Sequence, residues 1–279
     1  MAQRIYCFNQ LVASDQVKVN LNLISKSGLT VLFFTILLLV LSGCALEEDE
    51  TVDWSAEKFY NEAKSDLDSG NYFEAIKLYE TLESRYPFGK YATQAQLDVA
   101  YAYHLFDEPE SALASADRFI RLHPRHNGVD YAYYLKGLIN FKRGGTVLDS
   151  IQTRDLSEYD QSHLVASFDD FSLLLKLFPN SKYANDARDR MVFLRNKMAE
   201  AELKAAEYYF SRDAWVAAAN RTRNILQTYQ GSDSIKRALQ IQYLSYTKLN
   251  LDKFAEDTRR VLIHNFGEKS AENLSASES

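Results

Sequence analysis

The side chains that could do chemistry in this chain are few and poorly arranged for catalysis. His123 and His126 stand three residues apart, but Pro124 between them breaks the helix that would align them as metal ligands. Gly144 and Gly145 lack the lysine and the strand context of a phosphate-binding loop. No Gly-x-Ser-x-Gly motif occurs. The sequence therefore predicts no catalytic residue, no metal site and no cofactor, and a protein that is not an enzyme.

The thiol of Cys44 has a setting that does suggest chemistry. Residues 29–41 carry no charge and are followed by Ser42-Gly43-Cys44. This stretch is too short for a bilayer span, which needs roughly 20 residues, but it suits the apolar core of a secretory signal. The order resembles the bacterial lipobox, in which a peptidase cuts before the cysteine. Cys44 would then carry an N-palmitoyl group and an S-diacylglycerol group.

Residues 1–43 are accordingly predicted to be a lipoprotein signal peptide. The segment before the apolar stretch is long for a signal, so either the signal is extended or translation starts after residue 1, and we favour the second. Residues 44–53, with consecutive acidic side chains at 47–50, are predicted to be a lipid-anchored acidic tether. By resemblance to enteric lipoproteins, Ala45 in place of aspartate indicates sorting to the outer membrane.

The charge of the remaining chain is acidic. Without residues 1–43 it has 29 basic and 37 acidic side chains, a net charge of −8, compared with −6 for the whole sequence. Such a body has no general attraction to nucleic acid. Because only Cys44 of the two cysteines is kept, a disulfide framework is excluded.

The body of the chain repeats a pattern of small residue, large apolar residue and helix stop. The repeats align on Pro87, Pro124, Pro179, Gln230 and Gly267. Small residues lie twelve positions upstream (Ala75, Ala112, Ser167, Ala218, Ala255), apolar residues five upstream (Leu82, Phe119, Leu174, Ile225, Leu262) and ring side chains one upstream (Tyr86, His123, Phe178, Tyr229, Phe266). The small and apolar positions share one helix face, and proline stops the helix. This resembles the tetratricopeptide repeat and predicts an all-α superhelix, an α-solenoid of about five helix pairs.

The intervals between the aligned positions divide the body. Residues 54–143 are predicted to hold repeats 1 and 2 and the first helix of repeat 3, with first helices at 54–69, 94–106 and 130–143. A polar insert at 144–163 separates the two helices of repeat 3. Residues 164–267 complete repeat 3 and form repeats 4 and 5, and residues 268–279 are predicted to be a disordered polar tail.

Residues 182–212 contain neither proline nor glycine. They predict one continuous helix of about 45 Å, at 1.5 Å per residue, as the first helix of repeat 4. A helix broken near Lys197 is the alternative. The register of the last repeats is the least secure, because Gln230 and Gly267 replace proline there.

Several strings resemble a known family over residues 54–267. They include Tyr86-Pro87-Phe88-Gly89 with Gln94 and Gln96-Leu97-Asp98, then Asp117-Arg118-Phe119-Ile120-Arg121, and Ala206-Glu207-Tyr208-Tyr209 through Trp215 to Asn220-Arg221. They are similar to the BamD family, lipoproteins of the outer-membrane β-barrel assembly machinery that are also described as competence (ComL-like) lipoproteins.

The resemblance implies a non-enzymatic subunit on the periplasmic face of the outer membrane. Its first repeats would receive unfolded β-barrel precursors, with Tyr86 near the pocket for their targeting signal. Its C-terminal repeats would dock on the periplasmic domain of a BamA-like barrel subunit through Arg221, and on BamC-like and BamE-like companion lipoproteins. Arginine suits docking because its planar fork pairs with carboxylates. Tyr86 could equally be a packing residue of the repeat, and Arg221 could equally be a solvated residue on the helix surface.

Two other functions compete with barrel assembly. A tetratricopeptide lipoprotein could serve as a scaffold for cell-wall synthesis or division, in which case it would purify with peptidoglycan synthases. A DNA-uptake factor would bind DNA directly, and the acidic charge balance disfavours this.

Overall fold

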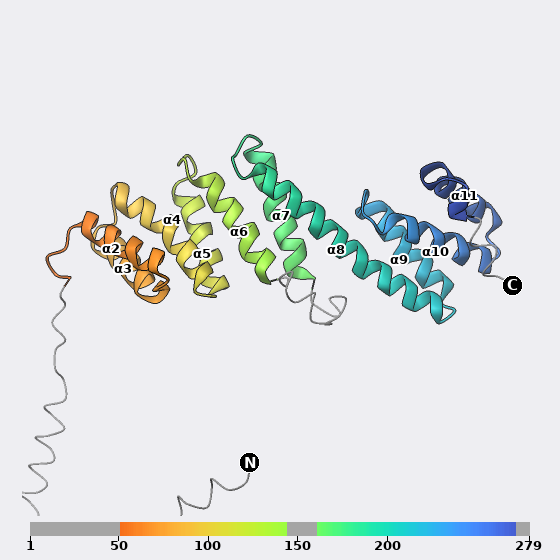
Figure 1. The fold of residues 1–279 in the computed structure, drawn as a ribbon, viewed down its shortest axis with the longest axis horizontal. Helices are drawn as coiled ribbons and strands as arrows, with labels where there is room; N and C mark the ends of the chain where they lie inside the picture. Colours follow the sequence, from red (N-terminus) through yellow and green to blue (C-terminus); the bar gives the residue numbers. More distant parts are fainter. Residues whose placement is uncertain (1–50, 144–160, 272–279) are drawn as a thin grey trace, which may run out of the picture. The chain divides into compact units, whose positions relative to one another are not determined.

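The computed structural model describes residues 51–143 and 161–271, and within these ranges all regular secondary structure is helical. The helices alternate between a first and a second helix of each pair (Figure 1). The first helices are α2 (Ala56–Ser69), α4 (Lys90–Leu105), α6 (Val129–Arg143), α8 (Ala184–Ser211) and α10 (Ile235–Lys248). The second helices are α3 (Tyr72–Arg85), α5 (Pro109–Leu122), α7 (Ser162–Leu177), α9 (Trp215–Thr228) and α11 (Asp252–Phe266).

Each helix packs on the next one in the chain, and the first helices α2, α4 and α6 also contact one another in sequence. The compact unit begins at Trp54. Packing between neighbours alone is the arrangement of a helical repeat array. The predicted all-α solenoid of five helix pairs is therefore confirmed.

The residues that set the repeat register form its core. The five aligned small residues are all buried, and so are the five aligned apolar residues. The small residues let the paired helix approach, and the apolar residues fill the space between pairs. The second helices α9 and α11 end at the aligned positions although Gln230 and Gly267 replace proline. The C-terminal register is thus the predicted one.

The turns inside the pairs share a backbone feature. Gly70, Asp107, Asp213 and Asn250 each have a positive φ, between 55° and 85°. All four stand seventeen residues before the aligned repeat end. A left-handed residue ends one helix and reverses the chain into the next, and glycine, asparagine and aspartate adopt it most readily.

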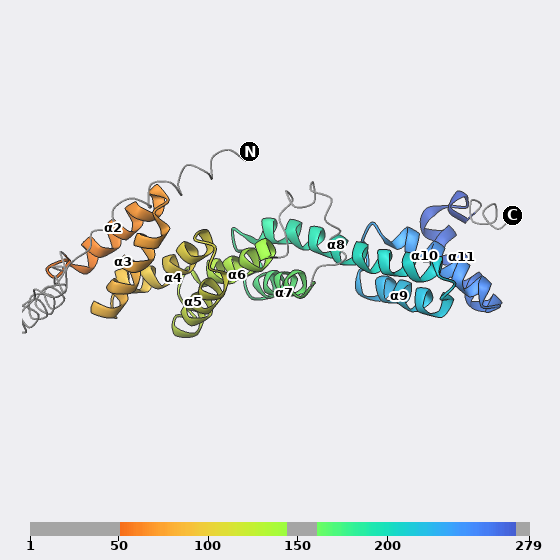
Figure 2. The same ribbon diagram turned by 90° about the horizontal axis from the view of Figure 1, so that it is seen from below.

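The long helix α8 is continuous over 28 residues, which corresponds to about 42 Å. The predicted unbroken helix is confirmed, with ends at Ala184 and Ser211 instead of 182 and 212. Figures 1 and 2 show α7 beside its N-terminal half and α9 beside its C-terminal half. Leu194 and Met198 pack with α7, whereas Ala199 packs with α9 and α10. One helix therefore belongs to two successive cores.

Some predicted boundaries differ from those of the structure. Helix α4 begins at Lys90, four residues before Gln94, because Gly89 already ends the preceding loop with φ 108°. Helix α7 takes in Ser162 and His163 from the predicted insert. Ser270 and Ala271, assigned to the tail, are buried, since Ser270 Oγ bonds to Gly267 O at 2.6 Å. The signal peptide, Cys44, most of the tether and insert, and residues 272–279 lie outside the described residues.

Gly137 on α6 lies against the ring of Phe171 on α7. A Cβ there would lie 2.6 Å from Cδ1 and 2.8 Å from Cζ of the buried Phe171 ring. We expect Gly137→Ala to lower the free energy of unfolding by ~1–3 kcal/mol through overpacking. The higher helix propensity of alanine offsets ~1 kcal/mol of this loss. Urea unfolding of Gly137→Ala, Phe171→Leu and the double variant checks this. The alanine should cost less in the Phe171→Leu background, and an equal cost in both backgrounds would contradict the close contact.

Candidate functional site

The first helices bring together tyrosines that are far apart in the sequence. Tyr60 on α2 lies 5.6 Å from Tyr91 on α4, measured between ring centroids. Further along, Tyr101 lies 6.5 Å from Tyr131, which lies 5.4 Å from Tyr183. Tyr183 in turn stacks on Tyr134 at 4.6 Å. The first helices and the turn before α8 therefore carry two groups of contacting tyrosines, and aromatic side chains of this kind are common in surfaces that bind other proteins.

Asp98 on α4 lies between two neutral donors. Its Oδ2 accepts a hydrogen bond from the Tyr60 hydroxyl at 2.8 Å, and its Oδ1 accepts one from Gln94 Nε2 at 2.9 Å. Burial raises the pKa of Asp98, and the two hydrogen bonds offset this only in part. Neither the bond from Tyr60 nor the bond from Gln94 to Asp98 is predicted from the sequence. The large number of tyrosines, 18 residues, was the one sign of aromatic contacts between helices.

The raised pKa of Asp98 predicts a pH-dependent effect of its replacement by asparagine. Because folding favours the protonated carboxyl, its contribution to stability is greatest below the unfolded-state pKa and falls as pH rises through the folded-state pKa. Asp98→Asn should therefore gain stability relative to the native chain as pH rises from 3 to 7. Thermal unfolding at both pH values checks this, with the exposed Asp169→Asn as control. A relative loss on raising the pH would contradict it.

Tyr86 caps helix α3 at the start of the loop to α4. Its hydroxyl donates to Trp54 O at 2.7 Å, and its ring lies 6.4 Å from that of the buried Phe59. The side chain keeps 36% of its surface exposed. Tyr86 therefore has a packing role and is partly accessible, and its part in precursor binding stays a prediction.

Arg221 on α9 lines a groove of about 490 Å³ with the C-terminal part of α8. Its Nη1 lies 3.2 Å and 3.3 Å from the two carboxylate oxygens of Glu202. Hydrogen bonding and charge from Glu202 raise the pKa of Arg221. The groove also contains Lys204, Glu207, Tyr208 and Tyr209, a mixture of rings and charges suited to a polar partner surface.

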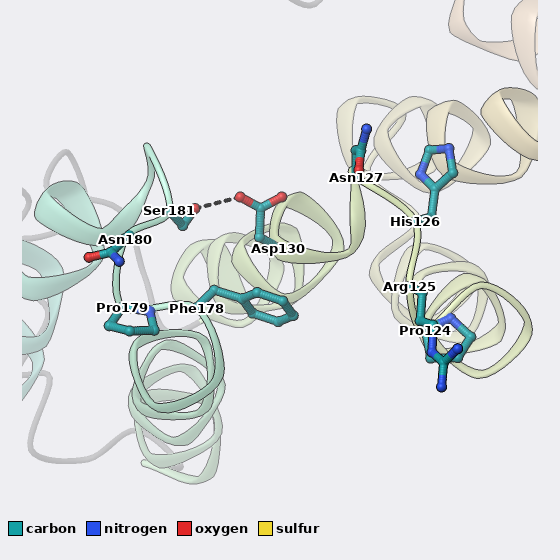
Figure 3. A pocket seen from close by; sticks show the side chains of 9 residues that line it. All are labelled: Pro124, Arg125, His126, Asn127, Asp130, Phe178, Pro179, Asn180 and Ser181. Carbon is teal, nitrogen blue, oxygen red and sulfur yellow. Dashed lines mark hydrogen bonds between the residues drawn. The ribbon is translucent and has the colours of Figure 1, made fainter.

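A second concave site lies between two equivalent inter-repeat loops (Figure 3). It has a volume of about 500 Å³, and its lining residues are Pro124, Arg125, His126, Asn127, Asp130, Phe178, Pro179, Asn180 and Ser181. Ser181 Oγ donates to Asp130 Oδ2 at 2.6 Å and joins the second loop to the start of α6. His126 Nδ1 accepts from Gly128 N at 3.1 Å. Both hydrogen bonds therefore join residues of the protein to one another.

The structure does not bring the predicted site residues into one place. Tyr86 belongs to the first repeat and Arg221 to the fourth, so they can serve only separate contacts. Among the residues described, no cluster of three or more His, Cys, Asp or Glu side chains could hold a metal ion. Over the same ranges no helix is long and apolar enough to cross a membrane.

Sequence comparison finds a family and close relatives. Residues 52–262 match the model of the YfiO family, described as an outer membrane lipoprotein. The outer membrane protein assembly factor BamD of Neisseria meningitidis serogroup B is 46% identical over 234 residues, covering 82% of this chain and 88% of the relative. BamD of Vibrio cholerae is 38% identical over 223 residues, covering 80% and 92%. BamD of Xylella fastidiosa strain Temecula1 is 36% identical, covering 84% and 80%.

Among solved structures, the chain is similar to the crystal structure of the MamA protein. The sequences are 17% identical, 77% of this chain and 94% of MamA are covered, and the TM-score is 0.33. A TM-score this low does not establish a common fold, so the fold assignment depends on the helix pairs described above.

Proposed function

The chain belongs to the BamD family, the YfiO outer-membrane lipoproteins, and from this premise we propose that it is an outer membrane protein assembly factor. It acts as a non-enzymatic subunit that receives unfolded β-barrel precursors and docks on the barrel subunit, promoting their folding and insertion into the outer membrane. The observation that carries this proposal is the extent of the relationship: relatives named as assembly factors match four-fifths of the chain at up to 46% identity.

The proposed location is the periplasmic face of the outer membrane. The family description supports an outer-membrane lipoprotein, and Ser42-Gly43-Cys44 after the apolar stretch supplies the acylation site. Each buried acyl CH₂ contributes ~0.8 kcal/mol, so three chains on Cys44 hold the protein firmly on the membrane.

The first repeats are the proposed receiving end for precursors. Tyr86 offers an exposed ring edge fixed by Trp54 and Phe59, and the tyrosines of α2, α4 and α6 add aromatic surface on neighbouring helices. A targeting segment that ends in an aromatic residue suits such a surface, since rings pair favourably at centroid distances of roughly 4.5–7 Å.

The fourth repeat is the proposed docking end. Arg221 lies in the α8–α9 groove with 45% of its side chain exposed, so its guanidinium can turn from Glu202 to a carboxylate of a BamA-like periplasmic domain. BamC-like and BamE-like lipoproteins are the further proposed partners of the C-terminal repeats.

Affinity purification of the detergent-solubilised protein, with its partners identified by mass, tests this assignment. We expect the barrel subunit and companion lipoproteins to be recovered. Recovery of peptidoglycan synthases without the barrel subunit would instead support a cell-wall scaffold, which the relatives' names do not favour.

A further inference from the structure

The loop between α3 and α4 presents an apolar side chain to solvent. Phe88 has 90% of its surface exposed, more than any other large apolar side chain in the described residues. The Tyr86 hydroxyl bonds the start of the loop to Trp54 O, and Gly89 turns the backbone into α4 with φ 108°. Phe88 thus projects from a loop that is bonded to Trp54.

Two lysines lie over rings next to this loop, one over Trp54, which bonds to Tyr86, and one over Tyr91 at the start of α4. Lys58 Nζ lies 4.2 Å from the centroid of the Trp54 ring, and Lys90 Nζ lies 4.6 Å from that of Tyr91. Both lysines are exposed. The nearby Glu57 carboxylate accepts the Tyr91 hydroxyl at 2.6 Å. Aromatic rings with adjacent lysines are the side chains that occupy the interface between lipid headgroups and acyl chains.

The length of the preceding chain places this loop within reach of a membrane. Nine residues, 45–53, separate Cys44 from Trp54, and an extended chain spans at most ~3.3–3.6 Å per residue, about 30–35 Å in all. Trp54 is bonded directly to the loop through Tyr86. If Cys44 carries the lipid anchor of the proposed function, Phe88 cannot lie far from the anchored leaflet.

We propose that the 86–89 loop is a membrane-contact surface whose occupant is the lipid leaflet that holds the anchor. The Phe88 ring enters the boundary between headgroups and acyl chains, and Lys58 and Lys90 bind lipid phosphates. An acyl anchor on Cys44 holds the chain at the membrane at one point only. A second contact through the loop fixes the first repeats at the membrane surface. This inference rests on the anchoring of Cys44.

A fluorescent probe at position 88 of the full lipidated protein tests the contact. After signal removal and acylation, Phe88→Cys would supply the one free thiol for an environment-sensitive dye. The labelled protein is reconstituted into phosphatidylethanolamine–phosphatidylglycerol vesicles with and without nitroxide lipids. Phe254→Cys on α11, where the native ring is 56% exposed, is the matched control. We expect a blue shift and at least about twofold stronger quenching at 88, as for a side chain ~5–10 Å into the interface.

A charge-reversal variant tests whether Lys58 and Lys90 bind lipid phosphates. Lys58→Glu with Lys90→Glu, in the Phe88→Cys background, should reduce the quenching at 88 and leave co-flotation with the vesicles unchanged.

Co-flotation with the vesicles distinguishes failure of the membrane contact from failure of the lipid anchor. If the protein floats with vesicles but the probe at 88 is quenched no more than that at 254, the anchor stands and the membrane contact is wrong. If it does not float, the anchoring premise fails and the contact with it. Shielding of position 88 only after a precursor peptide or the barrel subunit is added would also overturn the membrane as occupant.

Discussion

Replacing Phe59 by alanine is expected to cost ~3–5 kcal/mol, as for other fully buried aromatic residues. The Phe59 ring is completely buried and lies 5.2 Å from Trp54 and 6.4 Å from Tyr86. Since repeats contact only their neighbours, the loss should appear as opening of the first repeat before the rest unfolds. Hydrogen exchange should therefore accelerate in α2 and α3 and stay unchanged in α10 and α11.

Phe73→Ala is the matched control for this experiment. Phe73 is on α3 and 60% exposed, so its loss should change stability by no more than ~0.5 kcal/mol. The Phe59 variant should also lose cross-linking of precursor peptides at position 86, because Tyr86 loses the ring against which it packs. Unchanged exchange in α2 would show that Phe59 does not hold this end together.

Replacing Arg221 by glutamate is expected to weaken binding to the barrel subunit's periplasmic domain by roughly thirtyfold. This is the low end of the range for a hydrogen-bonded interfacial charge, because the side chain is half-exposed. The folded state should lose roughly 1 kcal/mol or more, because the new glutamate faces the carboxylate of Glu202, whose side chain is only 17% exposed. Titration of the purified domains, together with thermal unfolding of each variant, measures both effects. Arg260→Glu, an exposed arginine on α11 paired with Asp257, is the control.

Exchanging the charges of Arg221 and Glu202 shows whether Arg221 binds the partner or only stabilises the packing of α8 and α9. The double variant Arg221→Glu with Glu202→Arg restores the ion pair between α8 and α9 but presents the opposite charge in the groove. Binding should remain weak if Arg221 contacts the partner. Recovery of native affinity would show that Arg221 only supports the packing of the two helices.

The repeat architecture could be predicted because it depends on the spacing of residues that are close together in the sequence. The small residue, the apolar residue seven positions later and the helix stop all act within one helix, so Ala75, Leu82 and Pro87 suffice to define a copy. The register even survives loss of proline, because Gly231 and Gly267 adopt positive φ values where the later repeats end.

The candidate surfaces were harder to predict because they depend on how helices rotate against one another. Tyr134 and Tyr183 stack although they come from α6 and the turn before α8. Tyr60 and Asp98 meet across 38 residues. The sequence pattern placed each on a first helix but did not define which rings would touch. Tyr86 and Arg221 were identified through family resemblance, and their contacts with Trp54 and Glu202 emerge only from the fold.

Depletion of the protein from its own cells tests the assignment to barrel assembly most directly. As it disappears, folded porins in the outer membrane should fall and unfolded barrel precursors should accumulate in the periplasm, as read from heat-modifiable mobility on gels. Normal amounts of folded porins after complete loss of the protein would contradict its role in receiving and delivering these precursors.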